Sequence, residues 1–172
     1  MTPKTVMPMP AAAMNAPRGT DVPPQSENTD KAVTTTPAMV ARIPIAVAAL
    51  VRDGLVLLVH RHPSRRWYPD CWDLVGGHVE PGESPHQAVG RECLEELGVR
   101  VHDPLRIPMT VNDPTLDVHA FLVRRWEGEP INAAPEEHDD LRWFRPGDLA
   151  RLTLAHPASR SSIARAVQVA TE

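Results

Sequence analysis

The sequence predicts an α/β (α+β) fold for residues 41–172, and three patterns predict it. Two apolar, β-branched runs at residues 43–51 and 55–60 are separated by Arg52-Asp53-Gly54, and Asp-Gly between such runs is a strong hairpin signal. Residues 85–97 carry the start and stop signals of a helix. The last residues, from about 161, place apolar side chains at helical spacing, at positions 163, 166, 167 and 170.

The elements follow in order. After the hairpin, residues 72–75 predict a short strand that leads into a glycine-rich loop at 76–82, which contains three glycines. After the helix at 85–97, two strands are predicted at 104–111 and 116–125, with Asn112-Asp113-Pro114 as the turn between them. A break at 126–130 and an acidic loop at 135–140 come before a strand at 141–144. A short helix at 146–152 and the last helix complete the domain.

Residues 1–40 differ in composition from the rest of the chain. They contain seven of its 19 prolines and none of its seven aromatic residues. Such a segment cannot bury enough apolar surface to offset the entropy of ordering it. We predict a disordered, proline-rich tail at 1–40 and one domain at 41–172. Two starts are compatible with this division: Met1, or Met39 with residues 1–38 an artefact of how the start was assigned.

Charge and composition exclude several classes of protein. The net charge of −4 and the mixed signs give no polyanion-binding surface, so we expect no nucleic-acid polymer as partner. Two cysteines cannot build a disulfide framework. No apolar run reaches 18 residues, and prolines at 3, 8 and 10 interrupt a signal peptide. We expect a cytoplasmic monomer or homodimer without a membrane anchor.

The helix at 85–97 carries the acidic side chains that suggest chemistry. Glu92, Glu95 and Glu96 stand at i, i+3 and i+4, so their carboxylates converge on one helical face. Three unpaired carboxylates repel each other, and a hard divalent cation, Mg²⁺ or alternatively Mn²⁺, would remove that repulsion. A solvated acidic face is the alternative that periodicity alone leaves open. In the preceding loop, glycines let the backbone approach a ligand, and its carbonyl groups can add metal ligands.

The spacing over residues 76–99, GGHVEPGESPHQAVGRECLEELGV, decides between these two interpretations. It matches G-x5-E-x7-R-E-U-x-E-E-x-G-U, where U is apolar, at every fixed position; these are Gly77, Glu83, Arg91, Glu92, Glu95, Glu96 and Gly98. Seven fixed residues at ordinary usage match by chance roughly once in 10⁹ start points. The stretch resembles the Nudix box, most closely that of the MutT branch. Most relatives have proline where this chain has Val75.

The resemblance implies a mixed β-sheet sandwiched between α-helices. It also implies Mg²⁺-dependent hydrolysis of a nucleoside diphosphate linked to another group. A (deoxy)nucleoside triphosphate, including an oxidised one such as 8-oxo-dGTP, would give monophosphate and pyrophosphate. Glu92, Glu95 and Glu96, with the Gly76 carbonyl, would hold the metal. Arg91 would pair with Glu83 and orient the loop and helix.

A further glutamate in the acidic loop would add a metal ligand or take the proton from water. Counting back from Trp143 places it at Glu137, with Glu136 as the alternative. His138 beside it is expected on the surface, with transfer of a proton as the alternative role.

Four residues are candidates for substrate contact. Arg61 lies where MutT-like relatives have an arginine that touches the nucleotide; a solvated cation is the alternative. In the loop at 64–71, Arg65 can clamp phosphate and Trp67 can stack on a base, unless the aromatic residues cover the core. His156, near an asparagine position of MutT, contacts a base or caps the last helix.

Other members of the same family suggest alternatives. ADP-ribose, a dinucleoside polyphosphate or a nucleotide sugar are other substrates compatible with the box. A non-catalytic nucleotide sensor is a further alternative, which the retention of all box glutamates disfavours.

Overall fold

The computed structural model describes residues 41–172. The predictions for the tail at 1–40 and for Met39 fall outside the described residues. Strand β1 (Ile43–Arg52) lies at the centre of a seven-stranded sheet and pairs in parallel with β7 (Leu116–Val123). The other pairings of this sheet are antiparallel. They involve β2 (Leu55–Arg61), β3 (Trp72–Asp73), β4 (Val75–His78), β6 (Leu105–Ile107) and β9 (His138–Phe144). The predicted mixed sheet is confirmed.

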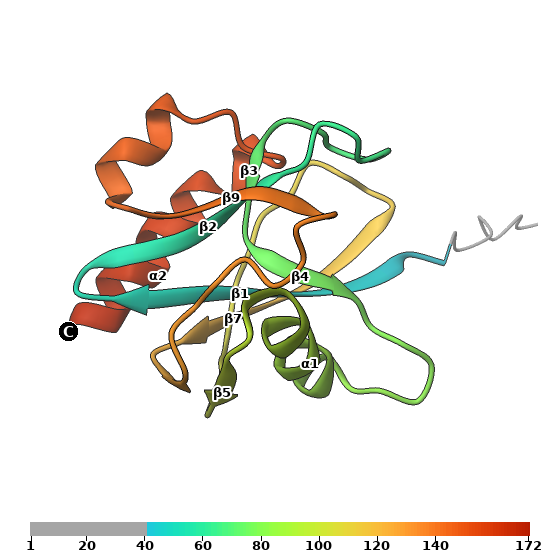
Figure 1. Ribbon diagram of the computed structural model, residues 1–172, viewed down its shortest axis with the longest axis horizontal. Helices are drawn as coiled ribbons and strands as arrows, with labels where there is room; N and C mark the ends of the chain where they lie inside the picture. The colour runs from blue at the N-terminus through green and yellow to red at the C-terminus, as the bar shows by residue number, and fades with distance from the viewer. Residues whose placement is uncertain (1–40) are drawn as a thin grey trace, which may run out of the picture. The chain divides into compact units, whose positions relative to one another are not determined.

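Two helices cover opposite faces of this sheet, as the fold prediction requires (Figure 1). Side chains along β1 alternate between the two faces, which is the period of a strand. Ala46, Ala48 and Leu50 pack with helix α1 (Pro85–Leu97), in the core that holds Val89 and Leu97. The side chains between them pack with α2 (Arg160–Thr171), which contributes Ile163, Ala166 and Val167.

The limits of α1 agree with the sequence signals. Ser84 is the N-cap: its side chain accepts from the backbone N–H of Gln87, and the Gln87 side chain accepts from the N–H of Ser84. Gly98 ends the helix in the left-handed conformation, with φ of 68°. The predicted hairpin is also confirmed, because Asp53 and Gly54 both have positive φ, as a tight two-residue turn requires.

Several predicted strand limits are wrong. The strand expected at 104–111 ends at Ile107, because Pro108 has no N–H to donate to the ladder. The strand at 72–75 is split into β3 and β4, and β4 takes in the first glycines of the expected loop. Two short strands, β5 (Arg100–His102) and β8 (Arg125–Glu127), pair in a separate sheet. They were missed because three residues are too few to establish a period, although each strand places an apolar side chain, Val101 or Trp126, between two polar ones. The helix at 146–152 is a 3₁₀ helix, Pro146–Arg151.

Candidate active site

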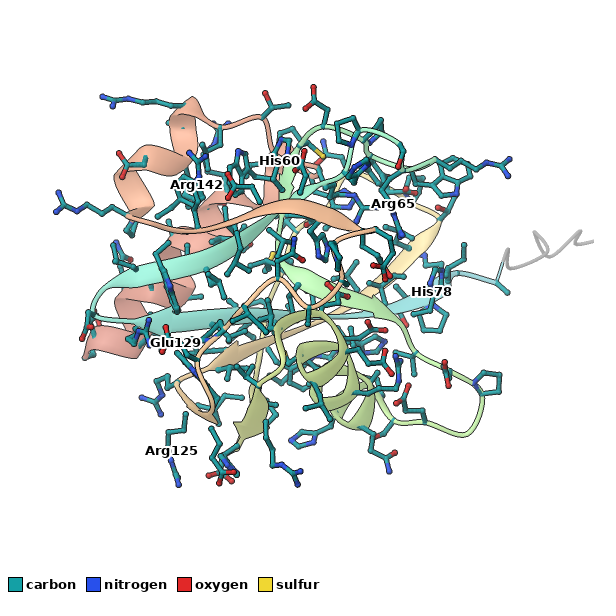
Figure 2. All side chains as sticks on the ribbon, in the orientation of Figure 1. His60, Arg65, His78, Arg125, Glu129 and Arg142 are labelled. Atoms are coloured by element: carbon teal, nitrogen blue, oxygen red, sulfur yellow. The ribbon has the colours of Figure 1, made fainter. Side chains whose placement is uncertain are left out.

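A cavity of about 690 Å³ opens at one end of the domain. It is lined by carboxylates and glycines near α1 and β4, by the aromatic loop after β2, and by apolar side chains of β1, β7 and the segment after β6. Figure 2 shows Arg65 and His78, which both line this cavity, on one side of the domain, while Arg125 and Glu129 lie on the other. The acidic lining residues are Asp73, Glu80, Glu92, Glu96, Asp113 and Glu137.

Two adjacent glycines in β4 let the sheet and α1 meet at the acidic end of the cavity. Gly76 has φ of 152°, and a Cβ there would lie 2.1 Å from the carbonyl oxygen of Ala46 in β1. A Cβ at Gly77 would lie 2.4 Å from Oε1 of Glu92. The backbone of Ala46 cannot move aside, so position 76 needs glycine, whereas a Cβ at position 77 would displace the Glu92 carboxylate. The Glu92 carboxylate therefore sits directly against the backbone of β4.

Arg91 connects the loop before α1 with the acidic face of the helix. Its Nε and one terminal nitrogen donate to the two oxygens of Glu83, each at 3.0 Å. The other terminal nitrogen donates to Glu92 at 2.8 Å and to Glu95 at 3.1 Å. These carboxylates hold the pKa of Arg91 above its usual range, and Arg91 in turn lowers the pKa of Glu83. The pair that the resemblance implied is thus formed, with two helix glutamates attached to it.

Glu96 is the most deeply buried acidic side chain of the site. It is 3% exposed, and its Oε2 lacks a hydrogen-bond partner, although His138 Nε2 lies 3.3 Å away. Burial, followed by the nearby Glu92 carboxylate, raises the pKa of Glu96 well above its usual value. Burial, followed by Arg61 and Arg65, lowers the pKa of His138 to about 4, so this imidazole is neutral near pH 7 and does not offset the charge. The expectation of a surface His138 is wrong, since it is 3% exposed.

The donor atoms here fit a hard divalent cation. The cavity brings together carboxylate oxygens of Glu92, Glu96 and Glu137 with the backbone at Gly76, and oxygen ligands are those that Mg²⁺ prefers. Within residues 41–172, no three acidic, histidine or cysteine side chains are already arranged to hold a metal ion. Two of these carboxylates form ion pairs with arginines instead: Glu92 with Arg91, and Glu137 with Arg65 at 3.0 Å.

Glu95 and Glu136, the two remaining acidic candidates, do not line the cavity. Glu95 does not line the cavity; its side chain is 57% exposed and bound to Arg91. Its assignment as ligand and catalytic residue stays a prediction. In the acidic loop, Glu137 lines the cavity and Glu136 does not. This placement favours Glu137 over its neighbour.

Arg61 is used to brace the aromatic loop. Its Nε donates to the carbonyl of Tyr68 at 2.9 Å, and a terminal nitrogen donates to the carbonyl of Trp67 at 2.8 Å. The other terminal nitrogen lies 3.6 Å from Asp73. Arg61 still lines the cavity, so its predicted contact with substrate stays open beside this structural role.

The aromatic loop places its two rings differently. Trp67 is 67% exposed at the rim, beside the Arg66 guanidinium, so it does not cover the core. Tyr68 turns inward, where its hydroxyl donates to Asp113 and its ring contacts the ring of His156, 4.6 Å between centroids. His156 makes no side-chain capping hydrogen bond.

One cavity residue, Asp113, was not predicted, whereas Tyr68 belongs to the loop at 64–71, whose aromatic residues were expected to stack on a base or to cover the core. The Asn-Asp-Pro pattern predicts a turn at Asp113. This local signal does not show that Asp113 also lines the cavity. The apolar cavity lining from β1 and β7 was also not predicted. Strand alternation shows which side chains share one face of the sheet, but it does not show that a cavity lies over that face.

A sheet between two helices, with buried carboxylates beside an apolar and aromatic cavity, has the features of an enzyme site whose oxygen donors suit a divalent cation. Residues 42–166 match the NUDIX domain family, so the chain belongs to that family. Its members are pyrophosphohydrolases acting on acid anhydrides in phosphorus-containing compounds, and they generally need a divalent metal, typically Mg²⁺. The predicted family, fold and enzyme class are confirmed at this level.

Three similar proteins show the range of the family. The NAD-capped RNA hydrolase NudC of Stutzerimonas stutzeri (strain A1501) is 38% identical over 128 residues, which cover 72% of this chain and 42% of that protein. The CTP pyrophosphohydrolase of Escherichia coli (strain K12) is 32% identical over 116 residues, 66% of this chain and 83% of that protein. The crystal structure of a MutT NUDIX hydrolase from Burkholderia pseudomallei superposes with a TM-score of 0.60 at 28% identity, and covers 74% of this chain and 96% of that one.

The coverage limits what these relatives say about this chain. The chain spans less than half of the length of the NAD-capped RNA hydrolase. The relatives differ in the substrates that their names give, so they support a nucleotide substrate without choosing one. Within residues 41–172, no helix is long and apolar enough to cross a membrane.

Proposed function

We propose that this chain is a Mg²⁺-dependent pyrophosphohydrolase that cleaves a (deoxy)nucleoside triphosphate to monophosphate and pyrophosphate. The observation that carries this proposal is that one cavity is lined by two kinds of side chain. Its buried carboxylates and its arginines suit a metal-bound polyphosphate, and its apolar and aromatic side chains suit a nucleoside. An oxidised nucleotide such as 8-oxo-dGTP falls within the proposed substrates. We place the enzyme in the cytoplasm, as a monomer or homodimer that acts without a nucleic-acid polymer.

Glu92, Glu96 and Glu137, with the Gly76 carbonyl, would hold the cation. A divalent cation so bound neutralises phosphate oxygens and lowers the pKa of a water molecule. Glu137 or a helix glutamate would accept the proton of that water. Arg91, through Glu83 and Glu92, fixes the orientation of the acidic helix face against β4. Glu95 would reach the site only after leaving Arg91.

Arg65 is suited to a second role in the same reaction. In the free protein it forms an ion pair with Glu137. Both side chains are 36% exposed, so the pair is partly hydrated and can be exchanged at modest cost. Glu137 bound to a cation would release Arg65, whose guanidinium could then bind a phosphate of the substrate.

The test is product analysis with a substrate panel. Purified protein and Mg²⁺ are incubated with canonical and oxidised (d)NTPs, ADP-ribose, NAD, diadenosine polyphosphates and NAD-capped RNA, and products are separated by ion-exchange chromatography. We expect monophosphate and pyrophosphate from a triphosphate. Glu96→Gln should lower turnover by about 10²-fold or more, whereas Glu129→Gln, on the other side of the domain, should not change it.

Three outcomes would contradict the proposal or its assignment of Glu96. Turnover of only a dinucleotide or a nucleotide sugar would move the substrate class to those compounds. Binding without turnover across the panel would support a nucleotide sensor. Near-normal turnover by Glu96→Gln, with an unchanged unfolding midpoint, would remove Glu96 from the catalytic site.

A further inference from the structure

The cavity lining includes a carboxylate outside helix α1, Asp113, that the proposed reaction does not use. Asp113 lines the cavity together with Val111, Leu116 and Val118. It stands at the point where the segment after β6 turns into β7. The hydrogen bonds that its carboxylate already accepts determine what it can still bind.

The hydrogen bonds of Asp113 are nearly complete. Its Oδ1 accepts from the backbone N–H of Thr115 at 2.9 Å and from the Thr115 hydroxyl at 2.5 Å. Its Oδ2 accepts from the Tyr68 hydroxyl at 2.5 Å. A carboxylate offers about four acceptor positions, so one position on Oδ2 remains for a ligand.

The Tyr68 hydroxyl also has no proton left to donate to a ligand. It has one proton, which it donates to Asp113, so only its oxygen lone pairs are left for a ligand. The hydrogen bonds that Asp113 receives, from Thr115 first, lower its pKa to about 2, which keeps it ionised. This pair therefore presents acceptors to the cavity and no donor.

The pair is held in place before any ligand arrives. Tyr68 has φ of 50°, an uncommon value for a residue with a side chain. Its carbonyl accepts from Arg61 Nε and from the Cys71 thiol, and its ring contacts His156. Such strain persists where surrounding contacts over-determine it, and it is common at binding sites.

We propose that Tyr68 and Asp113 read the edge of the nucleobase, and that they select bases with an exocyclic amino group over bases with a carbonyl at that position. This inference rests on the proposed nucleoside triphosphate substrate. An amino group donates to the free position on Asp113. A carbonyl oxygen at the same place would face the acceptor atoms of this pair and would lose hydration without gaining a partner from either residue.

Matched nucleotide pairs give the test. CTP has an amino group where UTP has a carbonyl, and ATP and ITP differ in the same way for the purine ring. In each pair the adjacent ring nitrogen also changes, from an acceptor to an N–H donor. Steady-state kcat/KM is measured for all four with Mg²⁺, from pyrophosphate release. For whichever ring size the enzyme accepts, we expect the amino member to be favoured by about tenfold or more.

Asp113→Asn supplies the matched variant, because an amide of the same shape presents a donor beside Tyr68. The ratio of amino to carbonyl substrate should fall towards one or invert, mainly through a faster reaction of UTP or ITP. Asp117→Asn is the control. Asp117 lies near by in sequence but outside the cavity lining, where it pairs with His119, so the ratio should stay that of the wild type.

Binding measurements separate this inference from the proposed function. Dissociation constants of the four nucleotides for the wild-type protein in EDTA are obtained by calorimetry. Tighter binding of CTP or ATP than of its carbonyl partner, without turnover in Mg²⁺, would support base reading while the proposed reaction fails. Hydrolysis of both members of a pair with equal kcat/KM and equal affinity would overturn the inference while the reaction stands. Failure to bind any of the four would also overturn it.

Discussion

Individual acidic residues in the cavity are balanced in different ways. Arg91 contacts Glu92, and Arg65 contacts Glu137, whereas Glu96 has a neutral histidine beside it. An uncompensated carboxylate in a low-dielectric site favours either a proton or a cation. The raised pKa of Glu96 means that its buried carboxylate favours a proton. The oxygen donors around Glu96 are suited to a cation in the place of that proton. A single side chain thus carries the strongest indication of a metal site.

Tyr68 gives a residue-scale prediction, because it is the only tyrosine of the chain. The hydrogen bond to Asp113 raises its pKa from 10.0 to about 12, with burial and Asp73 acting in the same direction and Arg61 against it. The ultraviolet absorbance of tyrosinate should therefore appear about two pH units later than in the unfolded chain. In Asp113→Asn the absorbance should appear at lower pH than in the wild type.

The sign of the linked stability follows from the same shift. A pKa that is higher in the folded state contributes stability that is fully present below pH 10, the unfolded value, and is lost as the pH rises through about 12. Wild-type absorbance that appears near pH 10 while circular dichroism still shows folded protein would contradict the hydrogen bond to Asp113.

At the scale of elements, the approach of β4 to β1 and α1 depends on side-chain size. Gly76 should not tolerate a Cβ, since that atom would overlap the Ala46 carbonyl oxygen and φ is positive. We expect Gly76→Ala to lower the free energy of unfolding by about 2–4 kcal/mol, measured by urea denaturation. Activity should fall with it, because Glu92 and Glu96 are positioned through the same contact of strand and helix.

Gly90 in α1 is the matched control for that substitution. A Cβ there would meet nothing within 4 Å, and alanine is favoured over glycine in a helix by about 1 kcal/mol. Gly90→Ala should therefore stabilise the protein and leave kcat unchanged. A destabilising Gly90→Ala, or a neutral Gly76→Ala, would show that the packing of β4 against its neighbours differs from that described.

For the whole molecule, the division at residue 40 has a direct test. The first hydrogen bond of β1 joins the Ile43 N–H to the Thr115 carbonyl, and the family match begins at residue 42. A chain that starts at Met39 should keep kcat and KM, and its free energy of unfolding should stay within about 0.5 kcal/mol of the full chain. A large loss of either would show that residues 1–38 belong to the folded enzyme.

The sequence anticipated elements where local signals coincide. Ser84, Gln87 and Gly98 set the limits of α1, and Asp53-Gly54 sets the hairpin, because caps and turns depend on neighbouring residues alone. Strand limits were less predictable. β6 is cut short by Pro108, and β5 and β8 exist only because they pair with each other across a gap in sequence. Such pairing has no local signature.

The sequence by itself determined the family, the acidic helix face and, through the family resemblance, the Arg91–Glu83 pair. These depend on spacing within one element or between adjacent ones. Only the tertiary structure decided that Glu96 is buried while Glu95 is exposed, that Arg65 reaches Glu137, and that Tyr68 meets Asp113. Tyr68 and Asp113 are 45 residues apart in the sequence. The physical reason is that burial and contact depend on how distant strands and loops pack together, and no local pattern records that packing.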